Sequence, residues 1–243
     1  MRPIGGLHTI VASKRHCRFK VNVPIVQFLG YKHFNLLPIS KFGDLTLSIE
    51  EGVVAVRMAR EEIDKKTKGE GAKETEAPAS FAQRSGVFVT IKRYPSKELR
   101  GCIGYPEPVL PLKEALVKSA QAATLDPRFP PLDREELTHV TVEVTVLTPP
   151  QLISVEKRRD YPTQVEIGRH GLIVERGLYK GLLLPQVAVE QGWDASELLS
   201  HTCMKACLMP DSWLLEETAV YRFEGQIFAE ESPYGEVREI PIR

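Results

Sequence analysis

The segment LRGCIGY, residues 99–105, places a cysteine where a thiol could do chemistry. In an extended chain alternate residues share a face, so we expect Arg100 to lie beside Cys102. A neighbouring cation lowers the pKa of a thiol and favours the nucleophilic thiolate. Gly101 and Gly104 allow a ligand or another backbone to approach closely. Cys102 is therefore a candidate nucleophile or ligand contact, and the alternative is a small buried cysteine that fills a tight strand.

Later segments hold residues that could complete a site with Cys102. His170, between glycines in GRHGL, is a candidate base because a Cys–His pair is the usual way to activate a thiol, with a surface turn as the alternative. In DPRFPPL, Asp126 can bond backbone amides, and Arg128 can pair with it or enter a cleft as an anion binder. The alternative for this segment is a stiff connector. Glu143 faces away from the valines of its strand, so it is a candidate carboxylate of the cleft or part of a solvated sheet face.

Other patterns exclude chemistry rather than suggest it. His201, Cys203 and Cys207 share a predicted helix, but a structural zinc usually takes four ligands with shorter cysteine spacing, so we predict core cysteines and no metal. The chain has no GxGxxG, Walker, HExxH, GxSxG or CxxC motif. Nucleotide-binding, zinc-protease, serine-hydrolase and thioredoxin chemistry are therefore disfavoured, and we expect no cofactor. Four cysteines are also too few for a disulfide scaffold.

Charge is distributed unevenly along the 243 residues. Residues 1–43 contain seven Lys/Arg and no acid, whereas residues 44–243 contain 25 Lys/Arg and 32 Asp/Glu. We interpret 1–43 as a basic extension that the folded domain does not need, with a nucleic-acid-binding arm or a transit-like leader as alternatives. The acidic body argues against nucleic-acid binding outside 1–43. We expect no membrane span, and the lack of a convincing signal peptide favours a cytoplasmic location.

The elements that must position these residues alternate between strands and helices. Ser48 and Glu51 have capping-box spacing at the start of a helix, Pro111 opens a second helix, and Asp194 with Glu197 caps a third. Alternating apolar residues and turn signals predict strands at residues 87–94, 99–104, 138–148, 171–176, 181–184 and 218–230. The order of strands and helix in the first half recurs in the second. It predicts an α+β fold with an internal duplication.

Six segments, taken in order, resemble the AMMECR family: LRGCIGY, DPRFPPL, VEVTVLTPP, VEIGRHGLIVERG, LLLPQVAVEQGWD and TAVYRFEGQIFAEE. These proteins are similar to the product of a human gene in the chromosomal region linked to Alport syndrome, midface hypoplasia and elliptocytosis. The resemblance covers residues 44–232, leaves 233–243 as a C-terminal tail, and is typical of a stand-alone archaeal or thermophile member. It implies a curled, barrel-like, mainly antiparallel sheet flanked by helices, with a cleft beside LRGCIG.

The resemblance also implies where a site would lie and what would use it. The site residues that it carries over are Arg100, Gly101, Cys102, Ile103, Gly104, Asp126, Arg128 and His170. It implies association with Memo-like and radical-SAM proteins and no established activity. We therefore expect a cleft that binds a small molecule or a protein. One hypothesis is an enzyme that uses Cys102, and the other is a non-enzymatic binding or regulatory module for a protein or RNA partner.

Overall fold

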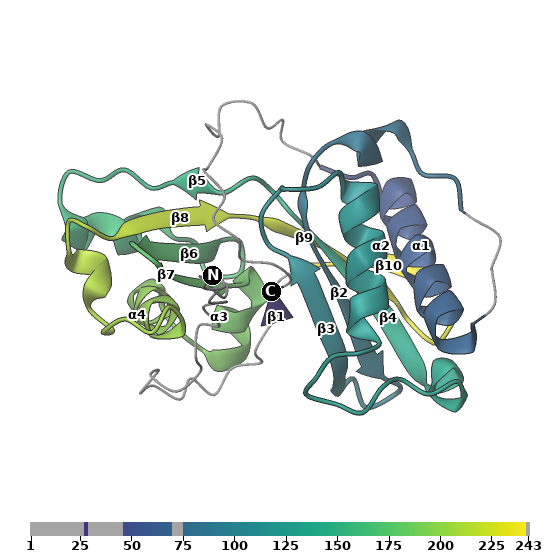
Figure 1. The fold of residues 1–243 in the computed structure, drawn as a ribbon. Helices are drawn as coiled ribbons and strands as arrows, with labels where there is room; N and C mark the ends of the chain where they lie inside the picture. The colour runs from purple at the N-terminus through teal and green to yellow at the C-terminus, as the bar shows by residue number, and fades with distance from the viewer. Residues whose placement is uncertain (1–26, 29–45, 70–74, 242–243) are drawn as a thin grey trace, which may run out of the picture.

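A computed structural model describes residues 27–28, 46–69 and 75–241, and its strands form two sheets (Figure 1). The six-stranded sheet consists, in spatial order, of β1 (Gln27–Phe28), β3 (Leu99–Tyr105), β2 (Gly86–Arg93), β4 (Val140–Leu147), β9 (Gly225–Glu230) and β10 (Val237–Ile240). The four-stranded sheet consists of β5 (Gln151–Leu152), β8 (Ala219–Phe223), β6 (Gly171–Arg176) and β7 (Tyr179–Leu183). Neighbouring strands are antiparallel except for β1 and β3.

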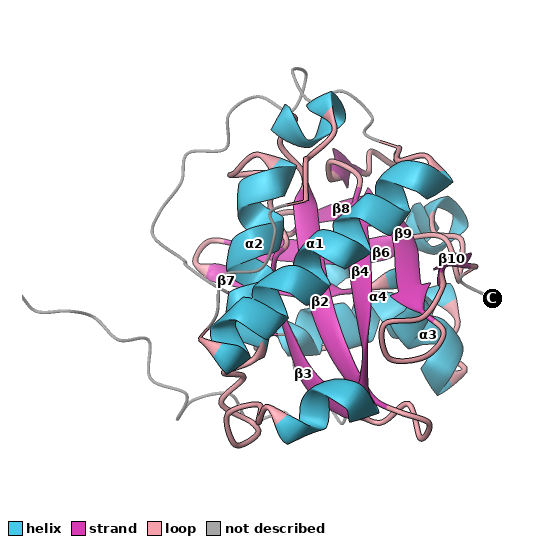
Figure 2. Ribbon diagram, turned by 90° about the vertical axis from the view of Figure 1, so that its right-hand side faces the viewer, coloured by secondary structure: helices cyan, strands magenta, loops and turns pink. Residues whose placement is uncertain are grey.

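Two helices, α1 (Ile49–Lys68) and α2 (Leu112–Ala123), lie across one face of the six-stranded sheet, as Figure 2 shows. The predicted capping box of α1 is confirmed: the Ser48 hydroxyl accepts from the Glu51 N–H at 3.2 Å, and the Glu51 carboxylate accepts from the Ser48 N–H at 3.0 Å. Apolar side chains at helical spacing turn inward and pack on the valines of β2 and β4. This packing forms the first core of the molecule.

The opposite face of the six-stranded sheet contributes to a second core. Phe88 and Cys102 pack there with apolar side chains from the four-stranded sheet, α3 (Pro185–Gln191) and α4 (Ala195–Lys205). Asp194 and Glu197 form the predicted capping box at the start of α4. Short 3-10 helices complete the described elements: η2 (Ala79–Ala82), η3 (Glu135–His139), η4 (Arg158–Gln164) and η5 (Ser212–Leu214).

Each sheet contains the same arrangement of strands and helix. In one, β2 pairs with β3 and, after α2, with β4; in the other, β6 pairs with β7 and, after α3 and α4, with β8. This is the order that the predicted duplication requires. Within the described ranges both sheets are open, with β1 and β10 outermost in one and β5 and β7 in the other. The fold is therefore a mixed α and β fold on antiparallel sheets, and the predicted barrel-like curling is not confirmed.

The prediction of one strand over residues 218–230 is wrong. The segment divides at Glu224, so that β8 joins the four-stranded sheet and β9 joins the six-stranded sheet. The Thr148 N–H donates to the Glu224 carbonyl at 2.9 Å, and the Glu224 N–H donates to Thr148 Oγ1 at 2.8 Å. These bonds replace strand pairing at Glu224 and hold together the two connections, β4–β5 and β8–β9, that run between the sheets.

The two segments predicted to lie outside the family domain each contribute a strand. β1 comes from residues 1–43 and pairs with β3, and β10 comes from residues 233–243 and pairs with β9. Apart from β1, the basic extension lies outside the described residues. In the part of the chain that the structure describes, we find no helix with the length and apolar character that crossing a membrane requires.

Candidate functional site

The strand that carries LRGCIG does not alternate regularly. Ile91 lies opposite Gly101, but Lys92 lies opposite Leu99, so Arg100 is the extra residue of a β-bulge. A bulge breaks the two-residue period of side-chain directions. Leu99 therefore packs against the second core, which also contains Cys102. The predicted placement of Arg100 beside Cys102 is wrong, because that prediction assumed a regular strand.

The buried Arg100 side chain forms an ion pair with the partly exposed Glu136 of η3. Its Nε and NH2 groups donate to the two carboxylate oxygens at 2.8 and 2.7 Å, and NH2 also donates to the Pro131 carbonyl at 3.2 Å. Arg100 is 3% exposed. Its hydrogen bonds lower the pKa of Glu136 to about 2, although partial burial opposes this shift. The guanidinium thus joins β3 to the segment that leads into β4.

Cys102 is a buried thiol on the face of β3 that meets the second core. It is 6% exposed, and the Thr90 hydroxyl donates to its sulfur at 3.3 Å. Burial raises the pKa of the Cys102 thiol to about 11, although the Thr90 hydrogen bond and the charge of Arg128 act in the opposite direction. A thiol with this pKa is protonated at neutral pH. The raised pKa therefore disfavours the thiolate that a nucleophile requires, and it favours the alternative of a buried cysteine that fills a tight strand.

The DPRF turn occupies the outer edge of β3 at Cys102. Asp126 Oδ2 accepts from the Cys102 N–H at 2.9 Å, and Arg128 NH2 donates to the Cys102 carbonyl at 3.3 Å. Arg128 Nε also donates to Asp126 Oδ1 at 3.0 Å. Burial opposes ionisation of Asp126, but these hydrogen bonds outweigh it and lower its pKa. Asp126 and Arg128 pair with each other, which was one of the predicted alternatives, and together they replace a neighbouring strand at this point.

Two glycines of the motif are required by close packing. A Cβ at Gly101 would lie 2.4 Å from the carbonyl oxygen of Ala123 at the end of α2. A Cβ at Gly104 would lie 2.3 Å from the Phe88 ring and from the Val87 carbonyl oxygen. Both glycines therefore let neighbouring groups of the protein itself approach β3.

Polar and charged side chains of the neighbouring strands β2 and β4 lie on the same face of the six-stranded sheet as Cys102. Thr90 lies opposite Cys102 on one side and opposite Glu143 on the other, so these three residues form a row across β3, β2 and β4. The Glu143 carboxylate forms an ion pair with Lys92 Nζ at 2.7 Å, and its charge contributes to the raised pKa of Cys102. Glu143 therefore lies on the same face as Cys102.

Helices α3 and α4 add two charged residues to this face. Burial raises the pKa of Glu190 in α3, with Lys92 lowering it and Glu143 raising it further. Burial also lowers the pKa of Lys205 at the end of α4, and the charge of Arg128 lowers it further. The half-buried Lys205 side chain has no ion pair or hydrogen bond in the described part of the chain. We call Lys92, Cys102, Arg128, Glu143, Glu190 and Lys205 the β3 site.

Sequence reasoning missed Lys205 and Glu190. Lys205 lies in LLSHTCMKACL, whose apolar stripe indicates only a core-facing helix, and Glu190 is one acid in a short helix. Both approach β3 across the interface between the sheets. No local pattern reports such a contact, because the residues are about 90 and 100 positions from Cys102 in the sequence.

His170 lies elsewhere, immediately before β6. Its Nδ1 accepts from the Glu166 N–H at 3.0 Å, and its Nε2 lies 3.9 Å from Glu224 Oε1. Burial lowers the pKa of His170, and Arg222 lowers it further. Among the described residues no hydrogen bond or ion pair joins His170 to Cys102, so the predicted Cys–His pair is not formed.

Of the two predicted core cysteines, Cys203 in α4 is buried, whereas Cys207 follows the end of the helix with a positive φ of 59° and is exposed, so the prediction is wrong for Cys207. The His201 ring in the same helix stacks on Trp193 at 3.8 Å between centroids. Burial raises the pKa of Cys203 to about 11. Within residues 27–28, 46–69 and 75–241, no three His, Cys, Asp or Glu side chains gather in a way that could hold a metal ion.

Comparison with known proteins agrees with the family resemblance. The AMMECR1 family model matches residues 56–228. Protein MJ0810 of Methanocaldococcus jannaschii is 53% identical over 194 residues, which cover 79% of this chain and 96% of that protein. Protein MK0488 of Methanopyrus kandleri is 52% identical, with 79% and 95% covered. The crystal structure of the uncharacterized protein PH0010 from Pyrococcus horikoshii is 47% identical and covers 80% of this chain and 98% of that chain, with a TM-score of 0.75. The chain therefore belongs to the AMMECR1 family.

Proposed function

We propose that this AMMECR1-family protein binds a small anionic ligand at the β3 site, between Arg128 and Lys205. The observation that carries the proposal is the half-buried Lys205 side chain, which has no ion pair or hydrogen bond among the described residues although it lies near a second cation. Two like charges in a partly buried setting disfavour each other. An anion between them would relieve this repulsion and supply the missing partner.

The charges around Cys102 also make the two ends of the β3 site different, one positive and one negative. Asp126 neutralises Arg128, so Lys205 supplies the surplus positive charge at one end. At the other end Lys92 is shared by Glu143 and Glu190, which leaves a surplus of acid. A ligand with an anionic group at Lys205 and hydrogen-bond donors toward Glu143 and Glu190 complements both ends.

The role of Cys102 in this proposal is packing and shape rather than nucleophilic attack. Burial raises the pKa of its thiol to about 11, and no base among the described residues is bonded to it. The enzyme hypothesis requires an opening that exposes the thiol and a base other than His170, whereas ligand binding requires neither. A binding or regulatory module is therefore favoured over a cysteine enzyme. Cytoplasmic location, the Memo-like and radical-SAM partners, and nucleic-acid binding through residues 1–43 stay predictions.

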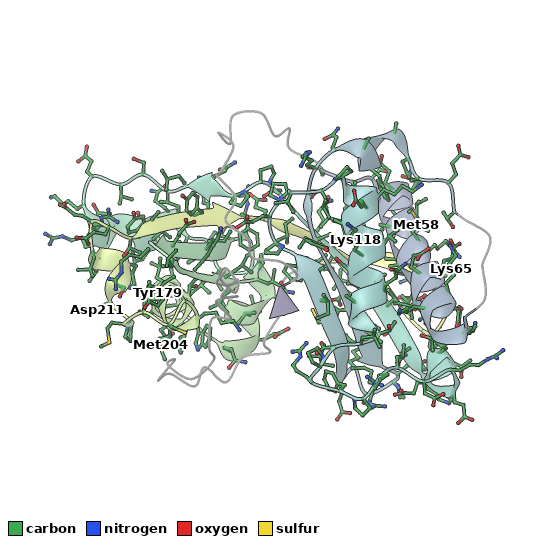
Figure 3. The ribbon with its side chains drawn as sticks, in the orientation of Figure 1. Met58, Lys65, Lys118, Tyr179, Met204 and Asp211 are labelled. Atoms are coloured by element: carbon green, nitrogen blue, oxygen red, sulfur yellow. The ribbon has the colours of Figure 1, made fainter. Side chains whose placement is uncertain are left out.

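The test is calorimetric titration of the full chain with inorganic phosphate and with pyrophosphate at constant ionic strength. We expect saturable binding to the wild type and at least about tenfold weaker binding to Lys205→Met, because one charged contact is lost. Lys118→Met is the matched control. Lys118 lies on α2, on the far side of the six-stranded sheet (Figure 3), and pairs with Glu114 at 2.7 Å. Equal binding by the wild type and Lys205→Met would contradict the proposal.

A further inference from the structure

A small pocket lies where the chain passes between the two sheets. It has a volume of about 190 Å³. Its lining includes Thr148, Gln151, His170, Arg222, Phe223 and Glu224. The two hydrogen bonds between Thr148 and Glu224 form part of its wall. We call it the His170 pocket. It shares no residue with the β3 site, so a ligand bound in it is independent of the proposed function.

His170 lines this pocket, and one of its ring nitrogens has no hydrogen-bond partner among the described residues. The residue is 8% exposed, and Nδ1 accepts a hydrogen bond from the Glu166 N–H. A neutral imidazole that accepts at Nδ1 carries its proton on Nε2. Nε2 lies 3.9 Å from Glu224 Oε1, which is beyond hydrogen-bond distance. Nε2 has no hydrogen-bond partner among the described residues, and His170 lines the pocket, so an acceptor atom of a ligand in the pocket can bond to it.

The pocket also contains one cation and one anion that are not paired with each other. Arg222 NH1 donates to the Gln164 carbonyl at 2.9 Å, and this is the one hydrogen bond of its guanidinium in the described residues. Glu224 Oε1 accepts from Arg169 Nε at 2.9 Å on the exposed side. Because Arg222 and Glu224 are two residues apart and both line the pocket, a ligand inside it meets both charges.

We propose that the His170 pocket binds an α-amino acid with a short side chain. The ligand carboxylate lies against the Arg222 guanidinium and accepts from His170 Nε2, and the ligand ammonium donates to the Glu224 carboxylate. The Glu224 carboxylate would repel an inorganic anion, and a simple ammonium ion offers no acceptor to Arg222 or to His170 Nε2. The zwitterion satisfies all three groups, and about 190 Å³ accommodates a side chain of a few atoms.

The test uses NMR of the imidazole nitrogens in the full chain, with His170→Asn used to identify the His170 signals among the six histidines. The spectrum of the free protein first reports whether the proton is on Nε2. The chain is then titrated with L-alanine, with propionate, which lacks the ammonium, and with ethylamine, which lacks the carboxylate. We expect saturable shifts of the His170 signals with L-alanine at concentrations about tenfold lower than with either analogue.

A variant separates the ammonium contact from general effects of charge. Glu224→Gln keeps the side-chain shape, so we expect it to bind L-alanine about tenfold more weakly and to lose the preference over propionate. Glu236→Gln, on an exposed turn, is the control and leaves the preference unchanged. Equal binding of propionate and L-alanine by the wild type would overturn the proposal, as would the absence of saturable shifts up to about 100 mM L-alanine, far above a millimolar dissociation constant.

Discussion

Arg100 and Arg128 both serve the strand that carries Cys102, but their charges are balanced differently. Arg100 leaves β3 through a bulge and is enclosed by Glu136 and the Pro131 carbonyl. Arg128 lies in the turn after α2 and contacts the edge of β3. It pairs with Asp126, and its positive charge acts on Lys205 of α4. Arg100 is buried and paired with a carboxylate, so its role is to stabilise the fold. Arg128 is neutralised by Asp126 but lies near Lys205, whose charge has no partner among the described residues and can be neutralised by a ligand.

The same contrast separates the two residues that sequence reasoning paired as nucleophile and base. Cys102 has its thiol, N–H and carbonyl all bonded within the protein. His170 lines a pocket and has one ring nitrogen bonded, while the other has no hydrogen-bond partner in the described residues. A motif residue with every group satisfied maintains the fold, whereas an unsatisfied group marks a binding position.

The largest expected effect on the free energy of unfolding comes from replacing Arg100. Arg100→Met keeps much of the volume but leaves the Pro131 carbonyl without its donor and the Glu136 carboxylate with only Arg93 and the Asp133 N–H. We expect a loss of about 3 kcal/mol in the free energy of unfolding, measured by urea denaturation. Arg238→Met is the control, because the ion pairs of Arg238 are exposed, and it should cost less than about 0.5 kcal/mol. Similar losses of unfolding free energy in Arg100→Met and Arg238→Met would contradict the structural role assigned to Arg100.

Close packing at the motif glycine gives the next effect. In Gly101→Ala the new methyl group meets the Ala123 carbonyl oxygen, which belongs to backbone and has little freedom to move. We expect a loss of about 2 kcal/mol in the free energy of unfolding. Gly225→Ala is the matched strand control, because its Cβ would have no contact closer than 3.4 Å. A Gly101→Ala protein as stable as Gly225→Ala would show that the glycine serves a ligand instead.

Acid should remove the contribution of the Arg100–Glu136 pair. The pKa of Glu136 is lowered from 4.5 to about 2 in the folded protein. A carboxylate of this kind stabilises the fold fully above its unfolded pKa and loses that contribution as the pH falls through the folded pKa. The stability difference between wild type and Arg100→Met should therefore shrink between pH 4.5 and 2. Urea denaturation at several pH values measures it, and a constant difference over this range would contradict the assignment.

The smallest effect on stability is expected at the surplus cation. Lys205→Met removes the repulsion from Arg128 and breaks no ion pair or hydrogen bond of the described residues. We expect a gain of up to about 0.5 kcal/mol in the free energy of unfolding without ligand. The Lys118→Met control loses one exposed helical ion pair and should cost about 0.3 kcal/mol. A loss above about 1 kcal/mol in the free energy of unfolding of Lys205→Met would show that Lys205 stabilises the fold and is not a ligand-binding cation.

Much of the fold could be predicted because its signals are local. Ser48 with Glu51 and Asp194 with Glu197 form capping boxes within four residues, and alternating valines identify β4. The division of residues 218–230 was not predictable, because apolar residues continue on both sides of Glu224. What separates β8 from β9 is a pair of bonds to Thr148, which is distant in the sequence.

The candidate site was predicted less well for a related reason. Asp126 and Arg128 were identified because a rigid turn and an ion pair within three residues leave a local signature. The bulge at Arg100 was missed, since it depends on the register between β2 and β3. That single extra residue reversed the expected neighbour of Cys102. Lys205 and Glu190 come from helices that reach β3 only when the second core forms.

The most direct test of the packing role of Cys102 is its rate of alkylation by iodoacetamide as a function of pH, with labelled peptides mapped to separate the four cysteines. A buried thiol whose pKa is about 11 predicts slow labelling near neutral pH that rises toward that value or awaits unfolding. Fast labelling of the folded protein with an apparent pKa below about 8.5, the ordinary value for a free thiol, would contradict this role. That result would make Cys102 an activated nucleophile and restore the enzyme hypothesis.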